Sequence, residues 1–274
     1  MGGSYASGAG RFRLGPVFLA IAGEGRTVYH PPDAQLVPRL VDELAAFAQH
    51  NASHVPPPAL AALVHVRLAG IHPFSDGNRR TARVLASLAM YRGGFTRPEF
   101  TSLEEWWGAH RADHYASFDC LGAAWNDDVD VTPFVESHIR AQRLQVDALS
   151  LRQATERTLW GVLEDIATEE LGMSPRVADA LYDAFFGREV TNRYYRALSD
   201  VSVATASADL VRLEASGLLT ASGAGRSRAY TGSAALVKAV AAAAALGEPP
   251  VASPLDAQRQ WALARLADRV HGSR

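Results

Sequence analysis

"IHPFSDGNRRTAR", residues 71–83, gathers a histidine, an aspartate, an asparagine and three arginines between two apolar segments of helical pattern. Pro73 interrupts the first helical pattern because proline cannot continue a helix, and Gly77 permits a left-handed backbone. Helical spacing resumes at Asn78, so the stretch predicts a loop that enters a helix. The free N–H groups and the positive dipole end of such a helix form an anion site, and we expect a phosphate there.

The charged side chains of this stretch fit phosphate chemistry. Arg79, Arg80 and Arg83 lie within about one turn of the expected helix and fan across one side of it, where they can clamp a polyphosphate. Asp76 offers oxygen ligands of the kind that Mg²⁺ prefers. His72 has a side chain whose pKa suits proton transfer at neutral pH. The stretch therefore predicts a site for phosphoryl or nucleotidyl transfer.

Composition indicates an ordinary globular protein of the cytoplasm. The 274 residues are 48% hydrophobic and 20% charged, and the net charge of −2 lacks the basic excess of a general polyanion binder. A lone cysteine, Cys120, excludes an internal disulfide and fits a reducing compartment. The longest apolar run, residues 239–246, is too short to span a bilayer, so we expect no membrane association.

The first half of the chain has the pattern of an all-α domain with one small hairpin. Residues 1–10 are small and polar, and we expect them to be disordered. Residues 12–30 are rich in strand-forming residues around the turn "AGEG", which predicts a hairpin. Apolar residues at helical spacing predict helices over 36–50, 55–71, 81–92, 102–124 and 132–152, with another across 154–171.

A second unit is expected after a helical linker at residues 146–173. Residues 174–234 predict two helices, a turn, a third helix at 203–216 and two short strands around a glycine-rich turn at 222–225. This order is typical of a winged helix-turn-helix, an α+β domain. Residues 235–274 form a helical tail that is open to packing against a second copy in a homodimer.

The opening stretch resembles the signature of the Fic family, His-Pro-Phe-x-Asp/Glu-Gly-Asn-Gly-Arg-x-x-Arg. Eight of its nine specified positions match, namely His72, Pro73, Phe74, Asp76, Gly77, Asn78, Arg80 and Arg83. The resemblance extends over residues 11–145. It implies a mainly α, Fic-type helical core with a small β-hairpin flap as the catalytic domain.

The same resemblance implies a protein adenylyltransferase that moves AMP from ATP, with Mg²⁺, to a Ser, Thr or Tyr hydroxyl of a target protein. His72 would be the general base, and Asp76 would hold the metal ion. The residues expected to bind the nucleotide are Gly77, Asn78, Arg79, Arg80, Arg83, Tyr115 and Phe118. An extended target segment would pair with the hairpin at Val28, Tyr29 and His30 by strand addition.

Arg79 departs from the family pattern, which has a glycine at this position. The related Doc toxins carry a lysine there and transfer the γ-phosphoryl group, so a Doc-like protein kinase is an alternative. The chain keeps Gly77 and Arg83, which differ in Doc, and this favours AMP transfer. The inhibitory Ser/Thr-x-x-x-Glu-Gly/Asn helix of many members is not found in this sequence, so it was never present, was truncated away or comes from a separate inhibitory protein.

The winged-helix pattern opens a third alternative, a DNA-binding regulator whose Fic core senses a nucleotide. Thr205 and Arg212 on the third helix, with Arg226 and Arg228 in the wing, are candidate DNA contacts. The unit lacks the basic excess of most DNA readers, which leaves target docking, oligomerisation or scaffolding as other roles.

Overall fold

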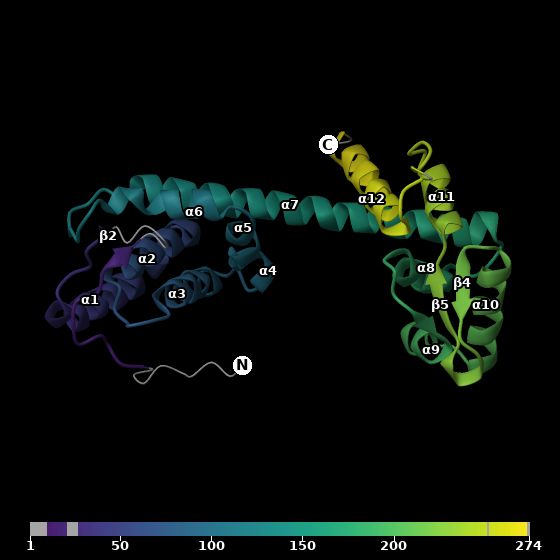
Figure 1. Cartoon of the computed structure of the whole chain (residues 1–274), viewed down its shortest axis with the longest axis horizontal. Helices are drawn as coiled ribbons and strands as arrows, with labels where there is room; N and C mark the ends of the chain where they lie inside the picture. The colour runs from purple at the N-terminus through teal and green to yellow at the C-terminus, as the bar shows by residue number, and fades with distance from the viewer. Residues whose placement is uncertain (1–9, 21–26, 251, 273–274) are drawn as a thin grey trace. The chain divides into compact units, whose positions relative to one another are not determined.

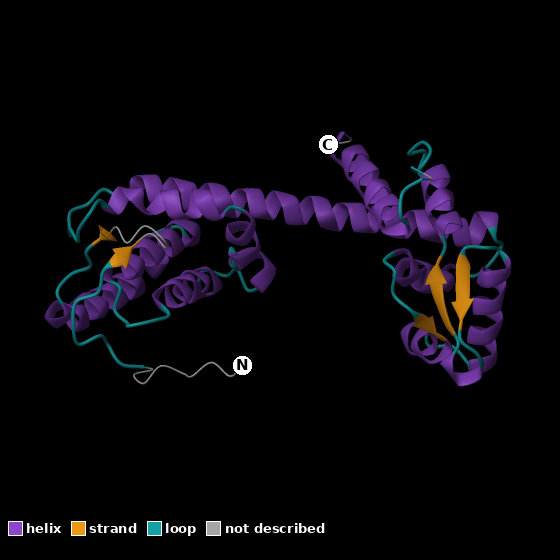
Figure 2. Cartoon of the chain, in the orientation of Figure 1, coloured by secondary structure: helices purple, strands orange, loops and turns teal. Residues whose placement is uncertain are grey.

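A computed structural model describes residues 10–20, 27–250 and 252–272. The chain divides into two units, residues 1–147 and 148–274 (Figure 1). Within the described residues the chain is mainly helical, with a two-stranded antiparallel sheet in unit 1 and a three-stranded antiparallel sheet in unit 2 (Figure 2). Nearly all of the predicted disordered start lies outside the described residues.

Unit 1 begins with the predicted hairpin and continues as helices. Strands β1 (Leu19–Ala20) and β2 (Thr27–Tyr29) pair antiparallel, with Leu19 opposite Tyr29, and the turn between them lies outside the described residues. The segments that follow are η1 (Ala34–Leu36), α1 (Val37–His50), η2 (Asn51–Ser53), α2 (Pro57–Ile71) and α3 (Asn78–Arg92).

Helix α2 is the central element of unit 1. Leu60 and Val64 pack on one side in a cluster with Leu40 of α1, while Val66 packs on another side with Phe134. A helix that is apolar all round is buried all round. The helical spacing of its apolar residues predicts one buried face, and the structure corrects this, because α2 is buried on more than one face. The central position of α2 fixes the place where its last residue begins the loop.

The region predicted as helical at 102–124 is a chain of short segments. These are α4 (Pro98–Thr101), α5 (Glu104–Ala109), α6 (Arg111–Ala116) and η3 (Ser117–Leu121). The backbone of His110 leaves the helical region between α5 and α6, and Gly122, with φ 69°, ends the last segment. These short segments carry side chains that reach the start of α3.

Helix α7 (Thr132–Asp165) replaces two predicted helices with one. After its second residue the helix contains no proline and one glycine, so nothing in its sequence forces a break. A π-helical turn, η4 (Ile166–Glu170), follows it. The division between the units, at residues 147 and 148, falls inside this helix.

Unit 2 follows the predicted order of three helices and a strand pair. Its elements are η5 (Pro175–Val177), α8 (Ala178–Phe185), β3 (Val190–Thr191), α9 (Asn192–Ser199), α10 (Val203–Ala215), β4 (Leu219–Ser222), η6 (Gly225–Ser227), β5 (Ala229–Gly232), α11 (Ala234–Ala243) and α12 (Leu255–Gly272). The sheet order is β3-β5-β4, and the sequence missed β3 because two residues are too few to show an alternating pattern.

The core of unit 2 includes residues that the sequence suggested as a linker and a tail. Leu159 and Leu163 of α7 are fully buried together with Phe185 of α8. Ala262 and Leu266 of α12 are buried in the same cluster. The stretches predicted as linker and tail therefore supply part of this core, because their apolar residues recur at helical spacing. Among the described residues, no helix has the length and apolarity needed to cross a bilayer.

Candidate active site

Two residues with left-handed backbones shape the loop between α2 and α3. His72 follows α2 with φ 51° and ψ 57°, and Gly77 precedes α3 with φ 86°. Glycine adopts this conformation freely, whereas a histidine in it is strained and must be held by its surroundings. The loop therefore presents the His72 side chain in a direction that neither helix alone would give it.

The side chain of Asn78 closes this loop. Its Oδ1 accepts the N–H of Phe74 at 2.8 Å, and its Nδ2 donates to the carbonyl of Phe74 at 2.7 Å. Asn78 is only 3% exposed. The amide that the sequence predicted as a nucleotide contact is thus occupied by the loop backbone, and its function in this structure is to shape the loop.

The start of α3 has the features of an anion site. The hydrogen bond from the Thr81 N–H to the Gly77 carbonyl, at 2.9 Å, is the one that opens the helix. The N–H groups of residues 78–80 belong to the first turn of α3 and have no carbonyl of a preceding turn to donate to. They point into the loop. Together with the helix dipole they favour a negatively charged ligand at this place.

Asp76 and Arg80 form an ion pair at the edge of the loop. Oδ1 of Asp76 accepts the Gly77 N–H at 2.6 Å, and Oδ2 lies 3.2 Å from Nη2 of Arg80. The two side chains are 75% and 72% exposed. Exposed ion pairs contribute little stability, so a phosphate and a metal ion can separate this one at small cost.

Arg83 is paired with Glu104, which comes from the first turn of α5. Nε of Arg83 donates to Oε1 of Glu104. The sequence predicted Arg83 as a phosphate ligand but gave no sign of Glu104, because the two lie 21 positions apart with helix α4 between them. Glu104 therefore holds a guanidinium that the predicted site requires.

Arg79 points toward α6. Its Nη1 donates to the hydroxyl of Tyr115 at 2.9 Å, and its Cζ lies 4.9 Å from the centre of the Tyr115 ring. The predicted aromatic neighbour Phe118 lies deeper, with its ring centre 4.8 Å from that of Phe134 and 5.4 Å from that of His114. Tyr115 thus borders the start of α3, whereas Phe118 contributes to the core of unit 1.

One ring nitrogen of His72 lies near a backbone carbonyl of α2. Its Nδ1 lies 3.4 Å from the carbonyl of Ala69. When Nδ1 carries the proton and donates to this carbonyl, Nε2 keeps a lone pair that can accept one. Burial lowers the pKa of His72, the Ala69 hydrogen bond raises it, and the charges of Arg13 and Arg79 lower it further. The net lowering keeps the ring neutral at pH 7, as a general base must be.

The hairpin is anchored to helix α2 and to the segment after η3. The Tyr29 hydroxyl donates to the carbonyl of Gly70 in α2 at 3.0 Å, and the Tyr29 side chain is buried. His30 makes a parallel bridge with Ala124, in which its N–H donates to the carbonyl of Ala123. Of the predicted docking residues, Tyr29 therefore serves the fold with its side chain. The side chain of Val28 lies outside the described residues.

The predicted DNA contacts of unit 2 are engaged within that unit. Arg212 donates to the carbonyl of Leu171 at 2.6 Å, and Nη2 of Arg228 lies 2.6 Å from Oε2 of Glu214. The Thr205 hydroxyl lies 2.9 Å from that of Ser202, which caps α10. The side chain of Arg226 lies outside the described residues.

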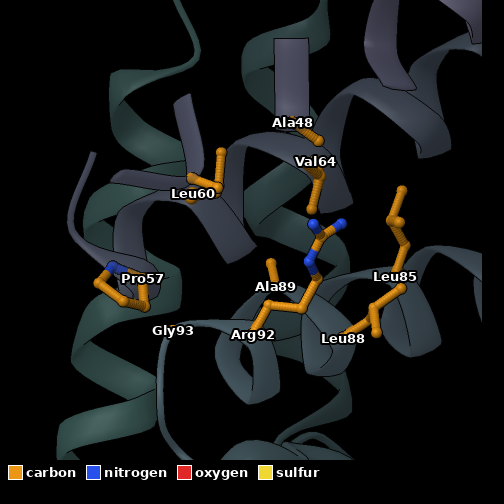
Figure 3. Close-up of a pocket in the computed structure, with 10 residues that line it drawn as sticks. Ala48, Pro57, Leu60, Val64, Leu85, Leu88, Ala89, Arg92 and Gly93 are labelled. Atoms are coloured by element: carbon orange, nitrogen blue, oxygen red, sulfur yellow. The ribbon is translucent and has the colours of Figure 1, made fainter. Parts of the chain in front are cut away.

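A small cavity with apolar walls lies between α2 and α3. Figure 3 shows its apolar walls, with Leu60 and Val64 from α2, Leu85 and Leu88 from α3, and the guanidinium of Arg92 beside them. Its volume is about 50 Å³. Pockets for nucleotide-sized ligands measure roughly 300–1,000 Å³, so this cavity is too small for one, and the open loop is the better candidate site.

No three or more His, Cys, Asp or Glu side chains in the described part of the chain are grouped to hold a metal ion. A magnesium ion at the loop would therefore rest on Asp76 together with ligand phosphates. This donor set fits Mg²⁺, which usually takes one or two carboxylates plus phosphate oxygens and water.

Comparison with known proteins agrees with the loop's chemistry. The profile of the Fic/DOC family matches residues 1–90, which include the loop and most of α3. The first third of the chain is thus similar to the Fic/DOC family. Its motif departs from the family signature at Arg79, and that position contacts Tyr115.

Curated relatives match about half of the chain. The protein is 33% identical over 127 residues to protein adenylyltransferase fic-1 of Caenorhabditis elegans, a match that covers 46% of this chain and 22% of the relative. It is also 32% identical over 152 residues to protein adenylyltransferase Fic of Nematostella vectensis. That match covers 54% of this chain and 31% of the relative. The chain thus spans less than a third of the length of these curated relatives.

Among solved structures, a Fic family protein from Desulfovibrio desulfuricans G20 is similar to this chain. The sequence identity is 20% and the TM-score is 0.47, and the match covers 82% of this chain and 62% of the other.

Proposed function

We propose that this chain is a protein adenylyltransferase, which transfers AMP from ATP to a hydroxyl group of a target protein. The observation that carries the proposal is the juxtaposition, in one loop, of a neutral imidazole at His72, an exposed carboxylate at Asp76 and the helix start of α3. Distant relationship to adenylyltransferases supports this activity over other transfer reactions.

In the proposed reaction, Nε2 of His72 accepts the proton of the target hydroxyl. The hydroxyl oxygen forms a bond to the α-phosphorus of ATP, and the bond from that phosphorus to the bridging oxygen breaks, so that pyrophosphate leaves. The N–H groups of residues 78–80 stabilise the phosphate charge that develops. Arg80 and Arg83 hold the β- and γ-phosphates. For this, the ion pairs Arg80–Asp76 and Arg83–Glu104 must break.

Asp76 is the residue proposed to hold Mg²⁺. A bound magnesium ion would supply positive charge against the phosphates. The Asp76 carboxylate is exposed, and one of its oxygens is fixed by the Gly77 N–H at 2.6 Å, so the other can turn from Arg80 to a cation.

The orientation of Arg79 supports AMP transfer over phosphoryl transfer. Its guanidinium lies on Tyr115 instead of facing the N–H groups at the start of α3. Phosphoryl transfer is nevertheless a second candidate, because an arginine at this position, in place of the family glycine, is the feature that resembles Doc proteins. The two reactions differ in which phosphate of ATP is left on the target.

For the target, we propose docking by strand addition at β2 beside Val28. His30, the other predicted docking residue, is not available for this pairing, because its N–H donates to the carbonyl of Ala123 and its carbonyl accepts the N–H of Trp125. A separate inhibitory protein and a homodimer are further partner hypotheses that the reaction does not require.

Unit 2 is proposed to be a winged helix that docks proteins. The order α8, β3, α9, α10, β4, β5 and the sheet order β3-β5-β4 support the winged helix. Val203 and Val211 on α10 are more than half exposed, and unit 2 has equal numbers of acidic and basic residues, which favours protein over DNA. Binding to duplex DNA that is lost on Arg226→Ala and Arg228→Ala would favour the regulator hypothesis instead.

The test of the reaction uses ATP labelled at the α- or the γ-phosphate, with Mg²⁺ and cell lysate as the source of targets. We expect α-label on protein, and at least about a hundredfold loss in His72→Ala, because a general base contributes on the order of 10²–10⁴ in rate. His50→Ala, at the exposed end of α1, is the matched control and keeps the label. Transfer of γ-label alone would establish the kinase alternative. Labelling that survives His72→Ala, or no labelling at all, rejects both reactions.

A further inference from the structure

Arg13 is a buried arginine that bonds to backbone carbonyls. It is 4% exposed, and Nε donates to the carbonyl of His72 at 2.9 Å. Nη1 donates to the carbonyl of Gly15 at 2.9 Å, and Nη2 donates to that of Pro32. Its own N–H donates to the carbonyl of Pro73 at 2.9 Å. One residue thus contacts both ends of the hairpin and two consecutive residues of the loop.

Burying a guanidinium is costly, since the group keeps its charge and loses its water. Burial lowers the pKa of Arg13, and the nearby charge of Asp33 partly offsets this. The three nitrogen atoms of the guanidinium donate to three carbonyl groups in different directions. Among the side chains, only that of arginine carries three such donors in one plane. A methionine of similar length would fill this space without the cost of burying a charge. We therefore infer that the role of Arg13 lies in its three hydrogen bonds to carbonyl groups.

The three carbonyls come from segments that the reaction must keep together. Gly15 lies ahead of β1, Pro32 lies after β2, and His72 is the first residue of the loop. The hairpin is where the target is proposed to dock, and His72 is where its hydroxyl is proposed to lose a proton. Beside Arg13, the rings of Phe12 and Phe74 lie 5.9 Å apart, which adds an apolar contact between the same two segments.

The carbonyl that Arg13 holds belongs to the strained residue of the loop. His72 has φ 51°, a conformation that histidine keeps only when its surroundings impose it. Hydrogen bonds from Nε of Arg13 to the His72 carbonyl and from the Arg13 N–H to the Pro73 carbonyl fix the two peptide groups that follow His72. The direction of the imidazole follows from this backbone.

We propose that Arg13 is a positioning residue, which fixes the backbone of His72 and its place relative to the hairpin. The proposal rests on the proposed function, in which His72 is the base and the hairpin receives the target. Arg13 acts through the His72 carbonyl and does not touch the reacting atoms.

The test compares Arg13→Lys and Arg13→Met with the control Arg39→Met in the full chain. Arg39 is exposed on α1 and pairs with Glu43, so its loss removes a charge of the same kind without touching the loop. Histidine labelled with ¹³C at the carbonyl gives nine signals, and the one lost in His72→Ala is that of His72. We expect this signal to move in both Arg13 variants and to stay in Arg39→Met.

Two further readouts separate positioning from a general role in the fold. The pKa of His72, followed by NMR, rises in Arg13→Met because a charge that lowers it is gone, and changes little in Arg13→Lys, which keeps the charge. In Arg13→Lys we expect kcat to fall about 10–100-fold, because small misplacement of a reacting group has this effect, while KM for ATP stays within about twofold.

Each outcome decides the proposal. An unmoved His72 carbonyl signal in Arg13→Lys, or a moved signal with unchanged kcat, overturns it. Loss of the helical circular dichroism in Arg13→Lys also overturns it, since Arg13 would then serve the fold as a whole. If the unmodified chain transfers no label, the proposed function fails by itself, and the carbonyl and pKa readouts still decide whether Arg13 holds His72.

Discussion

The pair of Arg83 and Glu104 shows how one residue outside the motif can set the state of the site. The side chains are 26% and 59% exposed, so the contact is partly screened by water. A nucleotide with three phosphates brings more negative charge to Arg83 than one carboxylate does. In the proposed reaction Glu104 therefore competes with the nucleotide for Arg83.

Substituting Glu104→Gln keeps the size of the side chain and removes its charge. We expect kcat/KM for ATP to rise by up to about fivefold, because a partly exposed ion pair contributes at most about 1 kcal/mol. Steady-state transfer of labelled AMP at varied ATP concentration measures this. Glu136→Gln, an exposed position on α7, is the control and stays at the unmodified rate. An unchanged or lower value in Glu104→Gln would mean that Glu104 does not compete with the phosphates.

At the scale of elements, the turn from α2 into α3 depends on one glycine. Gly77 has φ 86°, and a Cβ at this position would meet only the end of the Arg80 side chain, at 3.7 Å. Space is therefore available, and the obstacle to a larger residue is the backbone conformation. A left-handed backbone costs roughly 1–2 kcal/mol for a residue with a side chain.

We expect Gly77→Ala to lower the free energy of unfolding of unit 1 by about 1–2 kcal/mol for this reason. Gly108→Ala is the matched control, since Gly108 lies within α5, has an ordinary backbone and has open space around its Cα. That control should be neutral or stabilising by up to about 1 kcal/mol, because alanine favours a helix. Urea unfolding followed by circular dichroism compares the two, and equal stabilities would contradict the assigned role of Gly77.

The same element shows what the sequence could predict. Pro73 and Gly77 mark the loop in the sequence, because each restricts or frees the backbone in a local way, and the structure confirms the loop between α2 and α3. The bonds from Arg13 to His72 and from Arg83 to Glu104 span 59 and 21 residues, and no local pattern encodes them. An arginine inside an apolar, strand-like stretch was the one available signal for the first of these.

At the scale of the whole molecule, the two units differ in their buried histidines. Unit 1 buries His65, His114 and His138, whose ring centres lie 5.4–5.9 Å apart in the pairs with His65. Ring nitrogens of all three have no hydrogen-bond partner among the described residues. Unit 2 has one histidine, the exposed His271. Burial lowers the pKa of His114 and of His138 to about 4, and that of His65 well below its ordinary value.

Acid should therefore weaken unit 1 selectively. The folded-state pKa values lie below the unfolded value of about 6.5, so this stability is complete above pH 6.5 and is lost as the pH falls toward about 4. The loss is on the order of 3 kcal/mol for each fully buried histidine. Calorimetry between pH 7 and 4 should show the transition of unit 1 falling faster than that of unit 2. His138→Phe should reduce the difference and His50→Phe should not; parallel behaviour of the two units would contradict the prediction.

Helix α7 also limits how the chain can be divided in the laboratory or by proteases. Phe134 near its start belongs to the core of unit 1, and Leu159 and Leu163 near its end belong to that of unit 2. A fragment that ends at residue 147, or one that begins at residue 148, contains only part of α7. At the cut, four peptide groups lose their hydrogen-bond partners within the helix. Expression fragments of either unit should therefore include the overlapping middle of α7, so that each retains intact turns beyond its own buried residues.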